Sequence, residues 1–182
     1  MKSLKFFNSF SNASLPVLIE AAKYGDEVAY EELISRTYRS VKLYCSSMAS
    51  PIEANDLAQE VYLRALKSKT PILHTNNIEA FMISIAKCVC ADYLSAKKKS
   101  IKLTAKLSNE RSNDSYEFYE NGIDLSHLND EQREVLLLIS ILGFSYQEAS
   151  DILNIPIGTI RSRFSRAKET AKQNLEATNT SF

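Results

Sequence analysis

A run of basic and hydroxyl side chains near the C-terminus, GTIRSRFSRAK (residues 158–168), carries the clearest chemical signal in the sequence. Ile160, Phe164 and Ala167 repeat at helical spacing, so they share one face of a helix and the arginines project from the other faces. The planar fork of arginine matches O6 and N7 of guanine in the major groove of DNA, and hydroxyl groups suit bases or phosphates. The candidate nucleic-acid contacts are Thr159, Arg161, Ser162, Arg163, Arg166 and Lys168.

Two helices are predicted in front of this run, and each begins with a capping box. Asn129 opens the first, expected over 130–142, and Ser145 opens the second; each is followed three positions later by Gln or Glu. Residues 154–156 form a turn before the basic helix, expected at about 157–175. A short helix, a tight turn and a longer helix make the helix-turn-helix arrangement, whose second helix enters the major groove. An ordinary three-helix bundle with a basic exposed face has the same pattern, so the motif alone leaves both interpretations open.

The charges of the chain are unevenly distributed, although its net charge is zero. Residues 81–107 carry six lysines and one acid, and residues 156–172 carry five basic residues and one acid. Residues 108–155, between them, carry ten acids and two basic residues. Two basic surfaces separated by an acidic stretch suit contact with phosphates at two places. Solvated helix faces of random sign would explain the lysines taken alone.

Helical periodicity also predicts four helices in the N-terminal half, whereas strand-like alternation is missing from the chain. These helices are expected at about 15–24, 26–48, 51–67 and 76–96. We therefore predict an all-α fold with two small helical domains joined by a flexible linker, the C-terminal domain being the helix-turn-helix. The domains are expected at residues 12–99 and 125–176, and the linker, acidic in its second half, at 100–124.

Enzymatic and metal chemistry have no support in the residues. The chain has two histidines, and no nucleotide-binding loop or nucleophile–base set can be assembled from its sequence. Its three cysteines lack zinc-type spacing and are expected to be reduced thiols, in the core or half-buried. No signal peptide or membrane-spanning segment is predicted. We expect a cytoplasmic protein that does not insert into membranes and is not an enzyme, with no catalytic residues, no cofactor and no metal ion.

Two segments of the chain resemble the bacterial sigma-70 family of RNA polymerase sigma factors, in particular its extracytoplasmic-function (ECF) group. In the C-terminal segment, LNDEQREVLLL, SYQEASDIL and GTIRSRFSRAK are similar to the fourth conserved region of the family. Upstream, DLAQEVYLRAL (56–66) and EAFMISIAKCVCADYLSAKKKS (79–100) are similar to the second conserved region. Together the similar segments span about residues 18–99 and 128–175, in the order and spacing of the family.

The resemblance implies a transcription initiation factor whose partners are core RNA polymerase and promoter DNA. The helix at 56–66 would dock on a coiled coil of the polymerase β′ subunit, the β flap would be a second polymerase contact, and the acidic linker would thread through the polymerase. The docking face would comprise Asp56, Gln59, Glu60 and Leu63. The arginine-bearing helix would read the −35 element, while the loop 72–78 and the next helix would open the −10 element and bind it as a single strand. The −10 candidates are His74, Asn76, Asn77, Lys87, Lys97, Lys98 and Lys99.

Departures from the family pattern are few. Its tryptophans are absent, and its terminal arginine run is replaced by Lys97–Lys99, which keeps the charge but loses bidentate geometry. The phrase DEQREVLLLISILGFSYQEA looks closest to the general stress-response subgroup, whose members are held by a small anti-sigma protein; such a protein is therefore an expected partner. The alternative is a sigma-like decoy that binds an anti-sigma protein without binding DNA. The arginines of the recognition helix and the lysines after Tyr93 argue against a decoy.

Overall fold

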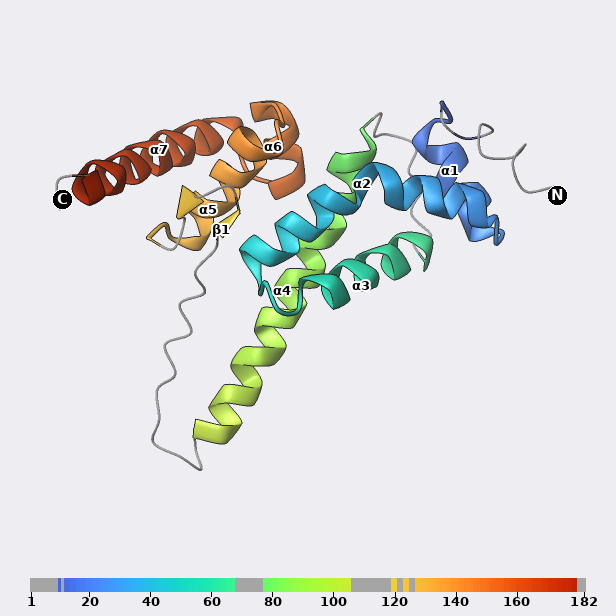
Figure 1. Ribbon diagram of the computed structural model, residues 1–182, viewed down its shortest axis with the longest axis horizontal. Helices are drawn as coiled ribbons and strands as arrows, with labels where there is room; N and C mark the ends of the chain where they lie inside the picture. Colours follow the sequence, from blue (N-terminus) through green and yellow to red (C-terminus); the bar gives the residue numbers. More distant parts are fainter. Residues whose placement is uncertain are drawn as a thin grey trace.

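Helices account for nearly all of the regular structure in the computed structural model, which describes residues 10, 12–67, 77–105, 119–120, 123–124 and 127–179. The helices follow one another along the chain in the predicted order (Figure 1). Two strands of two residues each form a small antiparallel hairpin between them. The elements are α1 (Leu15–Lys23), α2 (Glu27–Met48), α3 (Ala54–Lys67), α4 (Ile78–Ala105), β1 (Tyr119–Glu120), β2 (Ile123–Asp124), α5 (Asp130–Leu136), the π-helical turn η1 (Leu137–Ile141), α6 (Tyr146–Leu153) and α7 (Ile157–Asn179). The predicted all-α class is confirmed.

The N-terminal half is organised around α2, which packs against α1, α3 and α4. Asp26 caps α2 by accepting a hydrogen bond from the backbone N–H of Ala29 at 3.0 Å. Leu33 and Val41 of α2 are fully buried, and their periodic spacing explains why the helix was predictable. A hydroxyl pair inside this core joins Thr37 of α2 to Tyr62 of α3 at 2.9 Å. Burial raises the pKa of Tyr62 to about 12, so its phenol stays neutral and the pair needs no counter-charge.

The boundaries of α3 and α4 differ from their predicted positions. The helix predicted from Pro51 begins at Ala54, because residues 51–53 form turns; the Ser50 hydroxyl still accepts from the Glu53 N–H, at 3.4 Å. The cap of α4 is Asn77 rather than its neighbour in the sequence, and its Oδ1 accepts from two backbone N–H groups at 3.0 and 3.2 Å. The predicted end of α4 near Ala96 is wrong. No glycine or proline interrupts the following residues, so the helix continues to Ala105, into the segment predicted as linker.

The C-terminal half contains the predicted helix-turn-helix. Both capping boxes are confirmed: Asn129 bonds with Gln132 at the start of α5, and Ser145 bonds with Glu148 at the start of α6. Asn154 ends α6 in the left-handed conformation, with φ of 55°, and the chain turns there into α7. The last helix extends past its predicted end, to residue 179.

A π-helical turn interrupts the helix that was predicted to be regular over 130–142. Its wider spacing is seen where the N–H of Leu142 donates to the carbonyl of Leu137 at 2.9 Å. Four consecutive residues from Val135 to Leu138 are buried, more than one face of a regular α-helix can hide from solvent. They are covered from two sides, because α5 packs against α7 and also against α2. Hydrophobicity alone marked this segment as buried but did not indicate the change of winding.

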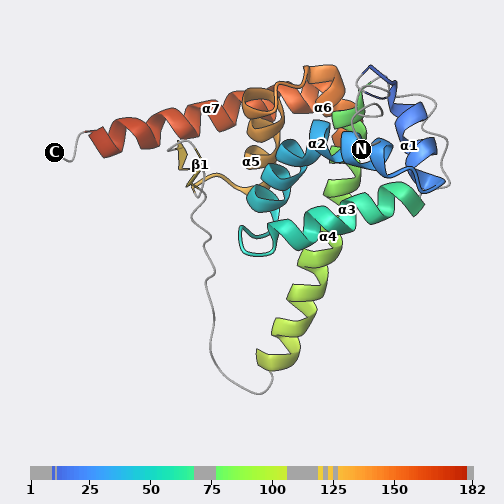
Figure 2. The same cartoon turned by 45° about the vertical axis from the view of Figure 1, so that its right-hand side comes forward.

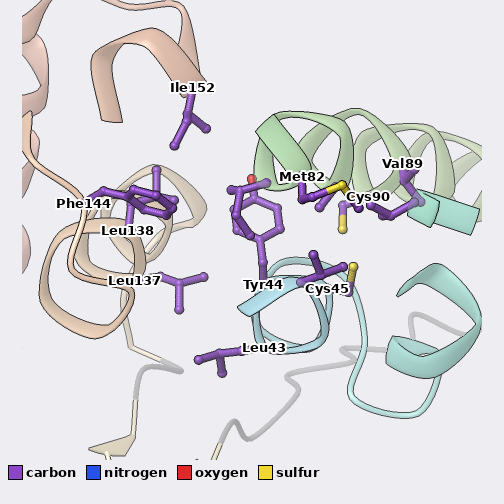
Figure 3. Packing of buried hydrophobic residues seen from close by; sticks show 14 of the residues in the cluster. Leu43, Tyr44, Cys45, Met82, Val89, Cys90, Leu137, Leu138, Phe144 and Ile152 are labelled. Atoms are coloured by element: carbon purple, nitrogen blue, oxygen red, sulfur yellow. The ribbon is translucent and has the colours of Figure 1, made fainter. Parts of the chain in front are cut away.

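The two halves share one continuous hydrophobic cluster. α2 contacts α5, and α4 contacts α6. Figure 3 shows Leu137, Leu138 and Phe144 of the C-terminal half facing Tyr44 of α2. Away from this contact, the C-terminal half of α4 extends outward from the rest of the molecule (Figures 1 and 2). Within the described part of the chain, none of the helices offers a stretch sufficiently long and apolar to span a bilayer.

Candidate nucleic-acid interface

The recognition helix α7 presents most of its predicted contacts to solvent. Arg161, Ser162, Arg166 and Lys168 are exposed, while Thr159 is half-buried. Ile160, Phe164 and Ala167 hold the opposite side of the helix in the core of the C-terminal half. The hydroxyl of Ser162 donates to the carbonyl of Thr159 at 3.0 Å, which leaves its oxygen able to accept from outside.

Arg163 has a different environment from the other arginines of α7. Its Nη2 donates to a carboxylate oxygen of Glu131 on α5 at 2.7 Å, and its side chain is only 24% exposed. This ion pair links the recognition helix to the first helix of the same half. Arg163 is thus held within the domain, whereas Arg161 and Arg166 project from it.

An aromatic pair that the sequence analysis missed lies beneath the cations of α7. The rings of Tyr146 and Phe164 meet edge to face, with their centroids 5.7 Å apart. The guanidinium of Arg161 lies over the Tyr146 ring at 5.9 Å, and the ammonium of Lys168 lies over the Phe164 ring at 4.8 Å. The sequence did contain a signal for this arrangement: Arg161 and Lys168 are seven residues apart, with the core residue Phe164 between them.

Two of the predicted −10 contacts lie at the junction between the halves. The side-chain amide of Asn77 donates to Glu148 of α6 at 2.7 Å. The ammonium of Lys87 donates to the carbonyl of Leu153, the last residue of α6, at 2.6 Å. A cation at that end of a helix is favoured by the helix dipole. In this conformation the polar groups of both side chains are therefore hydrogen-bonded to α6 of the C-terminal half.

The three lysines of the −10 set, Lys97, Lys98 and Lys99, lie away from that junction. Lys98 and Lys99 are exposed and Lys97 is half-buried; all three lie in the part of α4 that extends away from the molecule (Figure 1). His74 and Asn76 lie outside the described residues. Among the −10 candidates that the structure describes, Asn77 and Lys87 therefore lie at the junction, apart from Lys97, Lys98 and Lys99.

A polar pair at the junction, with Tyr44 buried and Glu134 half-buried, was also not anticipated. The phenol of Tyr44 on α2 donates to a carboxylate oxygen of Glu134 on α5. Burial is the main cause that raises the pKa of both groups; the hydrogen bond from Tyr44 and the positive charges of Lys87 and Arg163 lower that of Glu134 in part. In the sequence, Tyr44 is one of a stripe of apolar residues, and its partner ninety positions away is beyond local patterns.

The predicted docking face on α3 is largely exposed. Asp56 and Gln59 are open to solvent, and Leu63 is 46% exposed although it is a large apolar side chain. Glu60 lies at the edge of this face and bonds to Arg64 at 2.8 Å. Arg64 also reaches Asp92 of α4 at 2.6 Å, so Glu60 belongs to a bridge between two helices. The pKa of Arg64 is raised by its hydrogen bonds, most by the one to Glu60 and next by the one to Asp92.

Comparison with known proteins places this architecture in a family. Residues 125–170 match the family model of sigma-70 region 4. The probable RNA polymerase sigma-C factor of Mycobacterium bovis is 30% identical over 168 residues, which cover 88% of this chain and 90% of that protein. The chain belongs to the ECF RNA polymerase sigma factors. Sigma factors direct transcription and are not enzymes.

Other comparisons agree with this assignment. The ECF RNA polymerase sigma factor EcfG of Rhodopseudomonas palustris is 31% identical over 137 residues, which cover 71% of this chain and 75% of that protein. Among solved structures, the sigma factor RpoE in complex with the anti-sigma factor NepR, from Bartonella quintana, superposes with a TM-score of 0.64 at 22% identity. That superposition covers 81% of this chain and 96% of the other, and it shows a common fold.

The described part of this sigma factor contains no candidate metal-binding site. No group of three or more His, Cys, Asp or Glu side chains there is arranged to hold an ion. The three cysteines are free thiols: Cys45 and Cys90 are buried, and Cys88 is exposed rather than half-buried as predicted.

Proposed function

We propose that this sigma factor reads the −35 element through α7 and the −10 element through α4 and the segment before it, while α3 docks on core RNA polymerase. The observation that carries the proposal is the exposure of Arg161, Arg166 and Lys168 on the second helix of a helix-turn-helix. A decoy that binds only proteins has no use for three exposed cations on that helix. Their charge suits phosphates, and the arginine forks suit guanine.

The proposed docking surface consists of Asp56, Gln59 and Leu63, with Glu60 at its edge. An exposed leucine among acidic and amide side chains fits a partner that offers both apolar contact and positive charge. The β′ coiled coil of the polymerase is the partner that the family resemblance implies. The β flap is the corresponding proposal for the C-terminal domain.

We further propose that residues 12–99 and 125–176 act as two domains, connected by 100–124, and that they separate when the factor engages polymerase. Asn77 and Lys87 cannot contact promoter DNA while they are bonded to Glu148 and to the Leu153 carbonyl. Separation would release both side chains and expose Tyr44 and Glu134. The packed arrangement would then be a resting form of the factor.

Control by an anti-sigma protein, in the cytoplasm where polymerase acts, is the remaining part of the proposal. Support comes from the solved structure of the sigma factor RpoE in complex with the anti-sigma factor NepR; a second structure of the same fold, CnrH, is a complex with the cytosolic domain of CnrY. The general stress-response subgroup is the proposed setting, because DEQREVLLLISILGFSYQEA resembles it most closely. Such a protein would keep the factor from polymerase until a stress signal removes it.

Polymerase docking can be tested by affinity capture of purified core RNA polymerase. The immobilised chain should retain core polymerase, Leu63→Ala should reduce retention about tenfold or more, and Asp56→Lys should abolish it. Arg166→Ala, on the far domain, is the matched control and should retain polymerase normally. Normal retention by Asp56→Lys would show that α3 is not the docking helix. Glu60→Lys is a poorer probe, because it also breaks the bridge through Arg64 to α4.

A further inference from the structure

The cations of α7 divide into two groups by what holds their side chains. We propose that Tyr146 and Phe164 form an aromatic support that directs Arg161 and Lys168 onto the phosphate backbone of the promoter, leaving Arg166, with Ser162 and Ser165, to face the bases. The inference rests on the proposed function, in which α7 enters the major groove of the −35 element.

The aromatic support is rigid because it belongs to the domain core. Phe164 is only 8% exposed, and its edge-to-face contact with Tyr146 joins α7 to the first residue of α6. Tyr146 itself follows Ser145, whose capping box fixes the start of that helix. The two rings therefore connect both helices of the helix-turn-helix. A side chain that rests on them takes its direction from the domain and not from its own rotamers alone.

Each ring carries one cation. The guanidinium carbon of Arg161 lies 5.9 Å from the centre of the Tyr146 ring, and Nζ of Lys168 lies 4.8 Å from the centre of the Phe164 ring. Both distances are within the range of cation–π attraction. Because seven residues make two helical turns, Arg161 and Lys168 project from the same flank of α7. They form a pair of charges in a line along the side of the helix.

Such a flank is suited to phosphates and not to base edges. A cation resting against a ring beside the helix is displaced from the helix front, where the bases of the major groove would lie. Orientation before binding also reduces the conformational entropy that the side chain loses on contact. Contacts of this type position a protein on the duplex but carry no sequence information.

The front of α7 has different side chains. Ser162, Ser165 and Arg166 are exposed and lie on the side of the helix opposite Ile160 and Ala167. The two serines are short, so they allow the helix to approach the floor of the groove. Arg166 is then the arginine with the reach and direction to meet a base, since Arg163 is held by Glu131 at 2.7 Å. Base discrimination at the −35 element is therefore assigned mainly to Arg166.

Binding of holoenzyme to promoter duplexes over a range of salt concentrations separates these roles. The holoenzyme is assembled from core polymerase and the full chain, and each variant is measured on a selected promoter and on the same duplex with a substituted −35 element. Arg161→Ala and Lys168→Ala should each reduce the salt dependence of log K by about one unit while weakening both duplexes equally. Arg166→Ala should reduce discrimination between the duplexes by about 5- to 150-fold.

The aromatic support is tested by a double-substitution cycle. Tyr146→Phe keeps the ring and should bind as the unmodified protein does. Tyr146→Leu should weaken both duplexes, and adding Arg161→Ala to it should cause less loss than Arg161→Ala causes alone. A purely structural role for Tyr146 would instead give additive losses. Thermal unfolding of each variant identifies any that fail to fold, in which case Arg161→Ala and Lys168→Ala, at exposed positions, still decide the matter.

Two results would overturn the inference. One is loss of base discrimination in Arg161→Ala or Lys168→Ala with an unchanged salt dependence; the other is additivity in the Tyr146 cycle. A different result would overturn the proposed function itself: an unmodified holoenzyme that binds the selected and the substituted duplex alike. The two failures are distinguishable, because the second is seen before any substitution is made.

Discussion

Glu134 and Glu148 both belong to the contact between the halves, yet their surroundings move their pKa values in opposite directions. Burial raises the pKa of Glu134 above its ordinary value of 4.5. Hydrogen bonds from the backbone of Ser145, then from the side chains of Asn77 and Ser145, lower the pKa of Glu148. The contact therefore contains one carboxyl group, Glu134, whose surroundings favour the protonated form, and one, Glu148, whose surroundings favour the carboxylate.

The raised pKa of Glu134 predicts that this residue stabilises the packed form most at acidic pH. A group whose pKa is raised in the folded state contributes fully below its ordinary pKa and loses that contribution as pH rises through the raised value. Urea unfolding between about pH 4 and pH 8 should therefore show the free energy of unfolding of the unmodified chain falling relative to that of Glu134→Gln as pH rises. Gln imitates the protonated carboxyl, so the variant itself should lack this dependence.

Glu148→Gln is the matched control, because the sign is reversed. Its lowered pKa means that its contribution is present above the ordinary value of 4.5 and is lost as pH falls through the lowered value. The free energy of unfolding of the unmodified chain should therefore fall relative to that of Glu148→Gln as pH falls. The same pH trend in both variants would contradict the assignment of the two environments.

Local patterns in the sequence predicted the helices and their capping residues, because apolar spacing and caps act within a few residues. Asn129, Ser145 and Asp26 begin their helices where the pattern placed them. Contacts between distant residues left no such trace. Lys87 meets a backbone carbonyl of α6, and Tyr44 meets Glu134, through pairings that depend on how the helices pack. The recognition arginines were found in the sequence, but only their packing separates Arg163 from the rest.

The capping box of α6 connects a helix start to the contact between the halves. The Ser145 hydroxyl accepts from the Glu148 N–H at 3.2 Å, and Oε2 of Glu148 accepts from the Ser145 N–H at 2.9 Å. The other carboxylate oxygen of Glu148, Oε1, accepts from the side-chain amide of Asn77 at 2.7 Å. Ser145→Ala should lower the free energy of unfolding by about 1 kcal/mol, measured by urea denaturation. Ser165→Ala, on the exposed side of α7, is the control and should change it by less than about 0.5 kcal/mol. Equal effects would mean that the cap contributes nothing particular.

At the scale of the whole molecule, the packed halves withhold two candidate DNA contacts. Figure 3 shows Leu43 of α2 on the side of that helix nearest Leu137 of η1. Leu43 is 8% exposed and Leu137 is fully buried. Neither residue is a predicted contact to DNA or polymerase, so the packing can be altered without changing those surfaces.

Leu43→Glu should separate the halves, because a carboxylate placed in an apolar contact loses its hydration without gaining a partner. Small-angle X-ray scattering should then record a larger radius of gyration than for the unmodified chain. The circular dichroism of the helices should remain. Leu43→Met, which conserves volume and polarity, is the control and should scatter as the unmodified chain does. An unchanged radius of gyration in Leu43→Glu would contradict the proposed resting form.

Promoter-directed transcription is the central claim, and run-off transcription with purified core RNA polymerase and a library of promoters tests it most directly. The full chain should yield discrete transcripts from a subset of promoters that share −35 and −10 sequences. With Arg166→Ala, dependence on the −35 sequence should weaken while the chain still binds core polymerase. Transcripts from none of the promoters, although the chain retains core polymerase and no inhibitor is present, would contradict the account and favour the decoy.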